Sequence, residues 1–107
     1  MKLRPVKNSS GALLGYSFRC PGCQMLGEYH GDRHVYYVTG SMVWSFNGNL
    51  ERPTFAPSLL NTYRHGGDDR EKVCHLFVRD GSIEYCGDCT HPLAGKVVPM
   101  LDFEEAP

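Results

Sequence analysis

The sequence predicts an all-β or β-dominated fold: a small single domain of antiparallel sheet with little helix, stapled by zinc. Twelve glycines and seven prolines interrupt the 107 residues so often that no long amphipathic helix fits. The readable segments are short and rich in β-branched and aromatic residues, which is typical of strands. Two Cys-x-x-Cys pairs, at 20/23 and 86/89, lie far apart and are suited to closing one tetrahedral site. Residues 1–107 are enough for one domain with a thin core, where a metal contributes usefully.

The N-terminal half contains three segments that are typical of strands. Leu13 to Arg19 reads as a strand that delivers Cys20. Residues 35–39 and 42–46 read as two more strands, and Gly40-Ser41 between them favours a hairpin turn. We therefore expect these last two segments to pair with each other.

Prolines and polar residues mark the segments that we expect at edges or in loops. Residues 52–58 contain two prolines, which favours an extended edge or a crossing segment. Residues 59–63 are expected to pair briefly, and the polar stretch 64–72 is the best candidate for a mobile loop. Residues 97–101 read as a last edge strand because a proline interrupts them, and the acidic tail 102–107 is expected to be loose.

The clearest hairpin covers residues 73–86, with Asp80-Gly81 at its tip. A two-residue loop places His75 opposite Cys86 and turns Cys74 toward the core. A three-residue loop with a bulge shifts the register by one, so that Cys74 faces Cys86 and His75 points away. The sequence leaves both registers open, and either one brings a ligand-forming side chain beside the second cysteine pair.

The chemistry of the cysteines favours a metal over disulfides or a redox pair. Five cysteines are an odd number, which fits a disulfide framework poorly. A redox Cys-x-x-Cys normally opens a helix, whereas a glycine soon follows Cys23. The candidates for the four ligands are Cys20, Cys23, Cys74, His75, Cys86, Cys89 and His91. Three other histidines, His30, His34 and His65, lie among polar residues and are expected at the surface.

Charge and hydropathy exclude several classes of function. The net charge is -1 and no basic block occurs, so bulk electrostatic binding to nucleic acid is not favoured. No apolar run approaches a membrane span, and the first residues lack the apolar stretch of a signal peptide. We therefore expect a cytoplasmic protein, where thiols stay reduced.

An ordered series of motifs resembles a group of small phage and prophage proteins, some of which carry the label "ammonia monooxygenase". The motifs begin with Cys20-Pro-Gly-Cys23 and Trp44-Ser-Phe-Asn-Gly48 and end with Cys74-His-Leu-Phe-Val-Arg-Asp-Gly81 and Asp88-Cys-Thr-His-Pro-Leu-Ala-Gly95. Between them stands Arg52-Pro-Thr-Phe-Ala-Pro-Ser-Leu59. That enzyme is membrane-embedded and this chain has no membrane segment, so we set the label aside. More distantly, the chain is similar to domains beside bacterial ubiquitin-like conjugation genes, for which a metal-dependent, peptidase-like role is suggested.

The resemblance implies a phage-encoded, zinc-binding β domain in a bacterial host cytoplasm. The position of Cys86 is usually apolar in those relatives, which favours Cys89 and His75 as ligands. The expected zinc ligands are therefore Cys20, Cys23, His75 and Cys89, with Cys74, His91 and Cys86 as alternates.

Three functions compete at this point. The first is a zinc-stapled, non-enzymatic module that binds a host or phage macromolecule, with host counter-defence as one role that it could serve. No acid, base and nucleophile constellation stands out, which favours this function. The second is a zinc-dependent, peptidase-like hydrolase in which Glu84 or Asp88 acts as general base beside an open metal position. The third is a small-ligand or nucleic-acid binder that uses Trp44 and nearby aromatic residues.

Overall fold

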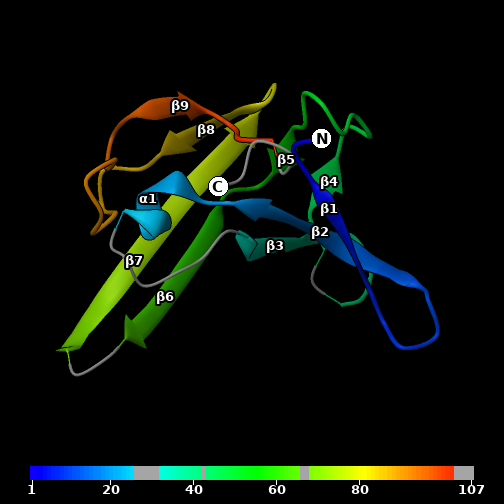
Figure 1. Ribbon diagram of the computed structural model, residues 1–107, viewed down its shortest axis with the longest axis horizontal. Coiled ribbons are helices and arrows are strands. Elements are labelled where there is room, and N and C mark those ends of the chain that lie inside the picture. Colours follow the sequence, from blue (N-terminus) through cyan, green and yellow to red (C-terminus); the bar gives the residue numbers. More distant parts are fainter. Residues whose placement is uncertain (26–31, 42, 66–67, 103–107) are drawn as a thin grey trace.

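The computed structural model describes residues 1–25, 32–41, 43–65 and 68–102 and confirms a β-dominated fold with antiparallel sheets (Figure 1). The elements are β1 (Arg4–Lys7), β2 (Leu13–Arg19), α1 (Pro21–Gln24), β3 (Asp32–Tyr37), β4 (Ser45–Phe46), β5 (Phe55–Ala56), β6 (Leu59–His65), β7 (Asp68–Arg79), β8 (Ser82–Tyr85) and β9 (Val97–Pro99). One sheet has the order β1-β2-β3, a second pairs β4 with β5, and a third has the order β6-β7-β8-β9. Within the described ranges, no helix is long and apolar enough to cross a membrane.

The first sheet delivers the first cysteine pair into the core. Strand β2 has the predicted bounds and pairs with both β1 and β3. Phe18 is buried near its end, and Cys20 follows as the residue that precedes the single helical turn α1. Because Pro21 occupies the first helical position, where no backbone N–H is required, the chain turns at once after the strand.

The predicted hairpin between residues 35–39 and 42–46 is wrong. Strand β4 is confined to Ser45–Phe46 and pairs with β5, whereas β3 pairs with β2. Aromatic packing explains the choice, because the Phe46 and Phe55 rings stack at 4.6 Å and Phe55 stacks on Tyr36 at 4.1 Å. Residue 42 lies outside the described residues. The expectation that the proline-rich segment 52–58 forms an edge is confirmed, since only Phe55–Ala56 joins a ladder.

The third sheet contains the longest strand, β7, which runs side by side with β6 to one end of the molecule in Figure 1. The predicted mobile loop at 64–72 is therefore wrong for most of its length. β6 extends to His65, β7 begins at Asp68, and their pairing continues to that end. The ladder continues past a register shift between Tyr63 and His65. It satisfies backbone polar groups there, and this outweighs the polarity of the side chains. Residues 66–67 lie outside the described part of the chain.

The hairpin of β7 and β8 adopts the two-residue register. Arg79 pairs with Ser82, and Asp80 and Gly81 have φ angles of 48° and 78°. Two positive φ values are the requirement of a type I′ turn, which Asp-Gly favours. The Cys86 N–H donates to the His75 carbonyl over 2.9 Å, which extends the predicted pairing of these two residues beyond the strand.

This register gives β7 two different faces. Cys74, Leu76 and Val78 are buried in the core, whereas His75 and Phe77 are only half-buried on the other face. Adjacent residues of a strand point to opposite sides of its sheet. Cys74 and His75 therefore serve different sites, although they are neighbours in the chain.

The C-terminal end is held against the N-terminus. β9 pairs only with β8 in the described chain, as expected for a strand that a proline interrupts. The Asp102 carboxylate accepts hydrogen bonds from the Met1 ammonium group at 2.8 Å and from Lys2 at 2.9 Å. These bonds lower the pKa of Asp102 below its usual value. The first residue of the predicted loose tail is thus anchored, and residues 103–107 are not described.

Candidate active site and metal centre

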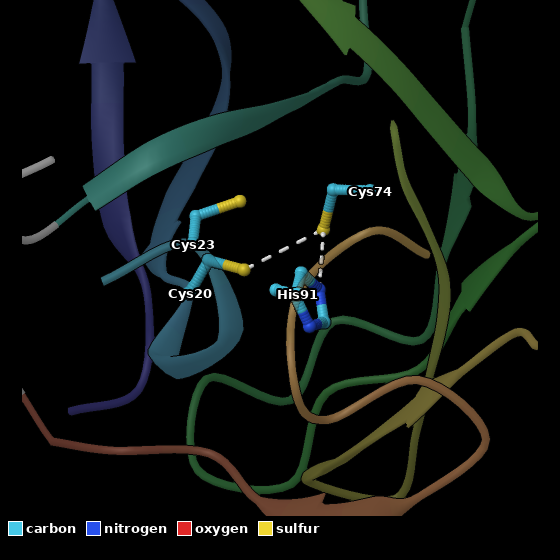
Figure 2. A group of neighbouring side chains, drawn as sticks. All are labelled: Cys20, Cys23, Cys74 and His91. Carbon is cyan, nitrogen blue, oxygen red and sulfur yellow. Dashed lines mark hydrogen bonds between the residues drawn. The ribbon is translucent and has the colours of Figure 1, made fainter. Parts of the chain in front are cut away.

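Three cysteines and one histidine converge in the core at the junction of the first and third sheets. Cys20, Cys23, Cys74 and His91 are all buried, and their ligand-forming atoms lie within 4.8 Å of one another. The Cys74 sulfur lies 3.6 Å from the Cys20 sulfur and 3.4 Å from His91 Nε2. Figure 2 shows the four side chains pointing toward one another from three separate segments. We call this group the buried cluster.

Two residues shape the buried cluster without joining it. A Cβ atom at Gly22 would overlap the His91 ring, so glycine is required between the first two cysteines for this ring to approach. The Tyr85 hydroxyl accepts a hydrogen bond from the Gly22 N–H and lies 3.2 Å from the Cys20 sulfur. The Tyr85 ring also packs edge-on against His91, at 4.5 Å between centroids. These contacts orient both the first cysteine and the histidine.

The three thiols of the buried cluster are coupled through hydrogen bonds to one another. Hydrogen bonds from Cys23 and Cys74 lower the pKa of Cys20. Hydrogen bonding to that thiolate raises the pKa of Cys23 to about 12, and it also raises the pKa of Cys74. Without a cation, one thiolate therefore keeps its neighbours protonated. Burial lowers the pKa of His91, which keeps its imidazole neutral, as a metal ligand must be.

The donor set fits a structural metal site. Three thiols and one imidazole correspond to the Cys₃His type, in which four protein ligands close a tetrahedral site. All four residues are buried, which leaves no solvent-exposed position for a substrate. The cluster is therefore suited to holding a metal ion that stabilises the fold.

The structure places the predicted ligands in two regions. Cys20 and Cys23 meet the alternates Cys74 and His91, while His75 and Cys89 do not join them. The Cys89 sulfur instead accepts a hydrogen bond from the His75 N–H at 3.3 Å and donates one to the His75 carbonyl at 3.1 Å. Burial and, secondarily, the nearby Asp88 carboxylate raise the pKa of Cys89. Cys89 thus fixes the backbone of His75.

One of the three histidines expected at the surface is buried. His34 is almost fully enclosed, and its Nε2 lies 3.4 Å from the Cys23 sulfur. It pairs across β2 with Phe18, which places it on the core face. The expectation failed because the polar neighbours of His34 in sequence say nothing of the face that it occupies. His30 and the side chain of His65 lie outside the described parts of the chain.

On the other face of β7, His75 bridges a serine and an aspartate. Its Nε2 lies 3.0 Å from the Ser58 hydroxyl oxygen, and its Nδ1 lies 3.2 Å from Asp88 Oδ2. The His75 side chain is 27% exposed and that of Asp88 58% exposed, so the group opens to solvent. A hydroxyl on one imidazole nitrogen and a carboxylate on the other is the arrangement of a Ser-His-Asp triad.

Ser58 is held at the junction between β5 and β6. The Trp44 indole N–H donates a hydrogen bond to the Ser58 carbonyl oxygen over 3.1 Å. A pocket of about 320 Å³ lies beside it, lined by Ser41, Val43, Trp44 and Pro57. Two of its lining residues therefore neighbour Ser58: Pro57 directly precedes it, and Trp44 binds its carbonyl oxygen.

Asp88 is positioned by a loop that is tied to β7 on both sides. Before Asp88, the Cys86 N–H donates to the His75 carbonyl. The Cys89 N–H donates to the Cys86 carbonyl at 3.3 Å, which closes the turn that contains Asp88. After it, the Thr90 N–H donates to the Val73 carbonyl over 2.9 Å, and the Val73 N–H donates to the Thr90 hydroxyl over 3.0 Å. The same loop therefore presents Asp88 to the exposed histidine and His91 to the buried cluster.

The sequence interpretation missed Ser58 as a functional residue. It treated Asp88 as a possible general base beside a metal and His75 as a ligand, and it assigned Ser58 no role. The one available signal was the occurrence of serine, histidine and aspartate within three of the quoted motifs. No local pattern marks such a group, because its members meet only through the pairing of β6, β7 and β8.

The exposed group has the parts needed for nucleophilic catalysis. A neutral imidazole that accepts from a serine hydroxyl activates the oxygen, and a carboxylate on the other nitrogen fixes the tautomer. The described residues thus contain two distinct sites. One is closed and rich in sulfur, and the other is open and contains a nucleophile, a base and a carboxylate that orients the base.

Comparison with known proteins agrees with this chemistry. The model of one protein family, described as the bacterial ubiquitination-like system serine protease BubE, matches residues 4–86. The match contains Ser58, His75 and the three cysteines of the buried cluster, and it ends before Asp88 and His91. Neither a curated protein nor a solved structure matches the chain. Because the match covers well over half of its length, the chain belongs to the BubE family of serine proteases from bacterial ubiquitination-like systems.

Proposed function

We propose that this chain is a serine hydrolase that cleaves peptide or isopeptide bonds in a bacterial ubiquitin-like conjugation system. The observation that carries the proposal is the hydrogen-bonded series Ser58–His75–Asp88, with distances of 3.0 Å and 3.2 Å. Both distances lie within the reach expected of a nucleophile, its base and the group that orients the base. Membership of a serine protease family supports the same reading and names the biological setting.

The residues divide the reaction as follows. The Ser58 oxygen attacks the carbonyl carbon of the scissile bond while its proton passes to His75 Nε2. The C–N bond then breaks, the amine leaves with that proton, and the acyl group remains on Ser58 as an ester. A water molecule attacks this ester with His75 again as base, which releases the acid and restores Ser58. Asp88 stabilises the protonated imidazole throughout and keeps Nε2 directed at the serine.

The pocket beside Ser58 supplies a site for a substrate side chain. Its wall includes the indole of Trp44, the ring of Pro57 and the exposed side chain of Val43. A largely apolar pocket of about 320 Å³ accommodates an aliphatic or small aromatic side chain next to the scissile bond. We therefore propose that the substrate carries an apolar residue close to the bond that is cut.

We further propose that the buried cluster holds zinc. Mixed thiolate and imidazole ligands in a tetrahedral set favour this ion. Cys20, Cys23, Cys74 and His91 would hold it, and its contribution would be to stabilise the core rather than to take part in hydrolysis. The proposed zinc is therefore structural, in contrast to the catalytic zinc of the zinc-dependent hydrolase that the sequence left open.

The expectation of a non-enzymatic module now ranks second. Phage origin, counter-defence and a macromolecular partner remain predictions, and none of them has a specific contact in its favour among the described residues. The triad and the family membership both support hydrolysis, so we propose it ahead of the non-enzymatic module.

The test is hydrolysis of a bacterial ubiquitin-like protein that carries a short C-terminal extension, followed by mass spectrometry of the products. Ser58→Ala should lower kcat/KM by about 10³-fold or more, because the nucleophile is lost. Ser82→Ala is the matched control, because Ser82 is half-buried like Ser58 and pairs with Arg79 and Pro99 instead of with His75. The control should retain activity within about twofold. Equal activity of Ser58→Ala and the unaltered chain would refute the assignment.

A further inference from the structure

A second group of ligand-forming side chains surrounds the exposed histidine. Ligand-forming atoms of His75, Cys86 and Asp88 all lie within 4.8 Å of one another. His75 and Cys86 are half-buried and Asp88 is exposed, so solvent reaches the group. The catalytic arrangement uses two of these residues and has no role for the Cys86 thiol.

The three side chains are already held close to the geometry of a metal site. Zinc binds sulfur at about 2.3 Å and imidazole nitrogen or carboxylate oxygen at about 2.0–2.2 Å, so ligand atoms of one ion lie about 3–4 Å apart. His75 Nδ1 and Asp88 Oδ2 are 3.2 Å apart, within that range. The backbone hydrogen bonds of Cys86 to His75 at 2.9 Å and to Cys89 at 3.3 Å fix the base of the third side chain. Small side-chain rotations therefore complete the set.

We propose that His75, Cys86 and Asp88 form a second, weaker site for a thiophilic divalent cation such as Zn²⁺, and that occupation of this site switches the hydrolase off. The inhibitory half of this inference rests on the proposed function. The three ligands are of the types that zinc prefers, and the exposure of the group leaves its fourth position to water.

Inhibition follows from the chemistry of the imidazole ring. If the ion takes Nε2, it occupies the lone pair that would accept the Ser58 proton. If the ion takes Nδ1, the proton of the neutral ring moves to Nε2, which then faces Ser58 as a donor and cannot act as a base. Either mode also draws the Asp88 carboxylate away from its orienting hydrogen bond.

The experiment uses the full chain with the buried cluster already loaded with one equivalent of zinc. Cobalt(II) is then titrated, and the near-ultraviolet sulfur-to-cobalt charge-transfer band reports whether a thiolate binds it. In parallel, zinc is titrated while a fluorophosphonate probe labels Ser58, since this labelling needs His75 as a base but no knowledge of the substrate. We expect a saturable cobalt band and a loss of Ser58 labelling that a chelator reverses.

The Cys86→Ala variant is the deciding comparison. It should label Ser58 as fast as the unaltered chain without zinc, lose the cobalt band, and need at least about tenfold more zinc for the same inhibition. A cobalt band that persists in this variant, or labelling that zinc does not slow, would overturn the inference. The inference would also be overturned if zinc accelerated hydrolysis and this acceleration required Cys86. That result would favour the hypothesis of a zinc-dependent hydrolase again.

The two proposals fail in different ways. If Ser58 never reacts with the probe, the proposed function is contradicted. In that case the Cys86-dependent cobalt band still decides whether the cation site exists. Ser58→Ala should keep that band, because the serine is not a ligand.

Discussion

The two faces of strand β7 carry different chemistry although they share a backbone. On the inner face, Cys74 is fully buried among two other cysteines and a histidine. On the outer face, the next residue, His75, is 27% exposed and contacts a hydroxyl and a carboxylate. The inner face excludes water, which favours tight metal ligation, and the outer face admits water, which hydrolysis needs. Changes one residue apart should therefore separate folding from catalysis.

The largest effect is expected on the inner face. Cys74→Ser removes a ligand from the buried cluster, and structural zinc contributes about 10–16 kcal/mol in small domains, against a total stability of about 5–15 kcal/mol. We expect most of the protein to be unfolded at 25 °C, as measured by circular dichroism. Cys86→Ser is the matched control on the outer side and should shift stability by about 1 kcal/mol or less. Equal melting curves for the two variants would contradict the expectation that the inner face of β7 stabilises the fold more than the outer face does.

The next effect belongs to the outer face. Asp88→Asn keeps the shape of the side chain but removes the charge that orients His75, so kcat should fall by about 10²- to 10⁴-fold. The melting temperature should hardly change, because Asp88 is 58% exposed. Glu84→Gln is the control, since Glu84 pairs with Arg79 on the same face and does not contact His75. A loss of stability without a loss of kcat would assign Asp88 to the fold instead.

A glycine pair tests how tightly the buried cluster is packed. Gly22→Ala should displace the His91 ring and weaken zinc affinity by about 10–100-fold, as measured by competition with a chromogenic chelator. Gly87→Ala is the control, because a Cβ atom there would meet nothing within 4 Å. If both variants hold zinc equally well, His91 does not depend on Gly22 and its role as a ligand is in doubt.

The smallest effect is expected at the support of the nucleophile. Trp44→Phe removes the indole N–H that binds the Ser58 carbonyl but keeps an aromatic wall for the pocket. One hydrogen bond of this kind contributes about 1 kcal/mol, so kcat/KM should fall by about three- to tenfold. Steady-state kinetics would measure the change, and an unaltered kcat/KM would show that Trp44 does not position Ser58.

Sequence reasoning predicted the local features and missed those that depend on distant contacts. The strand before Cys20 and the hairpin with Asp80-Gly81 at its tip followed from residue patterns. The sequence left two registers of this hairpin open, and the structure adopts the two-residue one. The pairing of β4 with β5 did not follow, because it depends on aromatic stacking across the core. The same limit applies to Ser58, because only the tertiary fold brings His75 on β7, and with it Asp88 on the loop after β8, beside it.

We propose that one small domain holds a structural metal on the inner face of β7 and a reactive serine on the outer face. Native mass spectrometry of the chain, purified without added metal and treated with a fluorophosphonate, tests both halves at once. We expect one species that carries a single zinc ion and a single adduct, with the adduct mapped to Ser58. A zinc-free folded protein, an adduct on another residue, or loss of the zinc on labelling would contradict it.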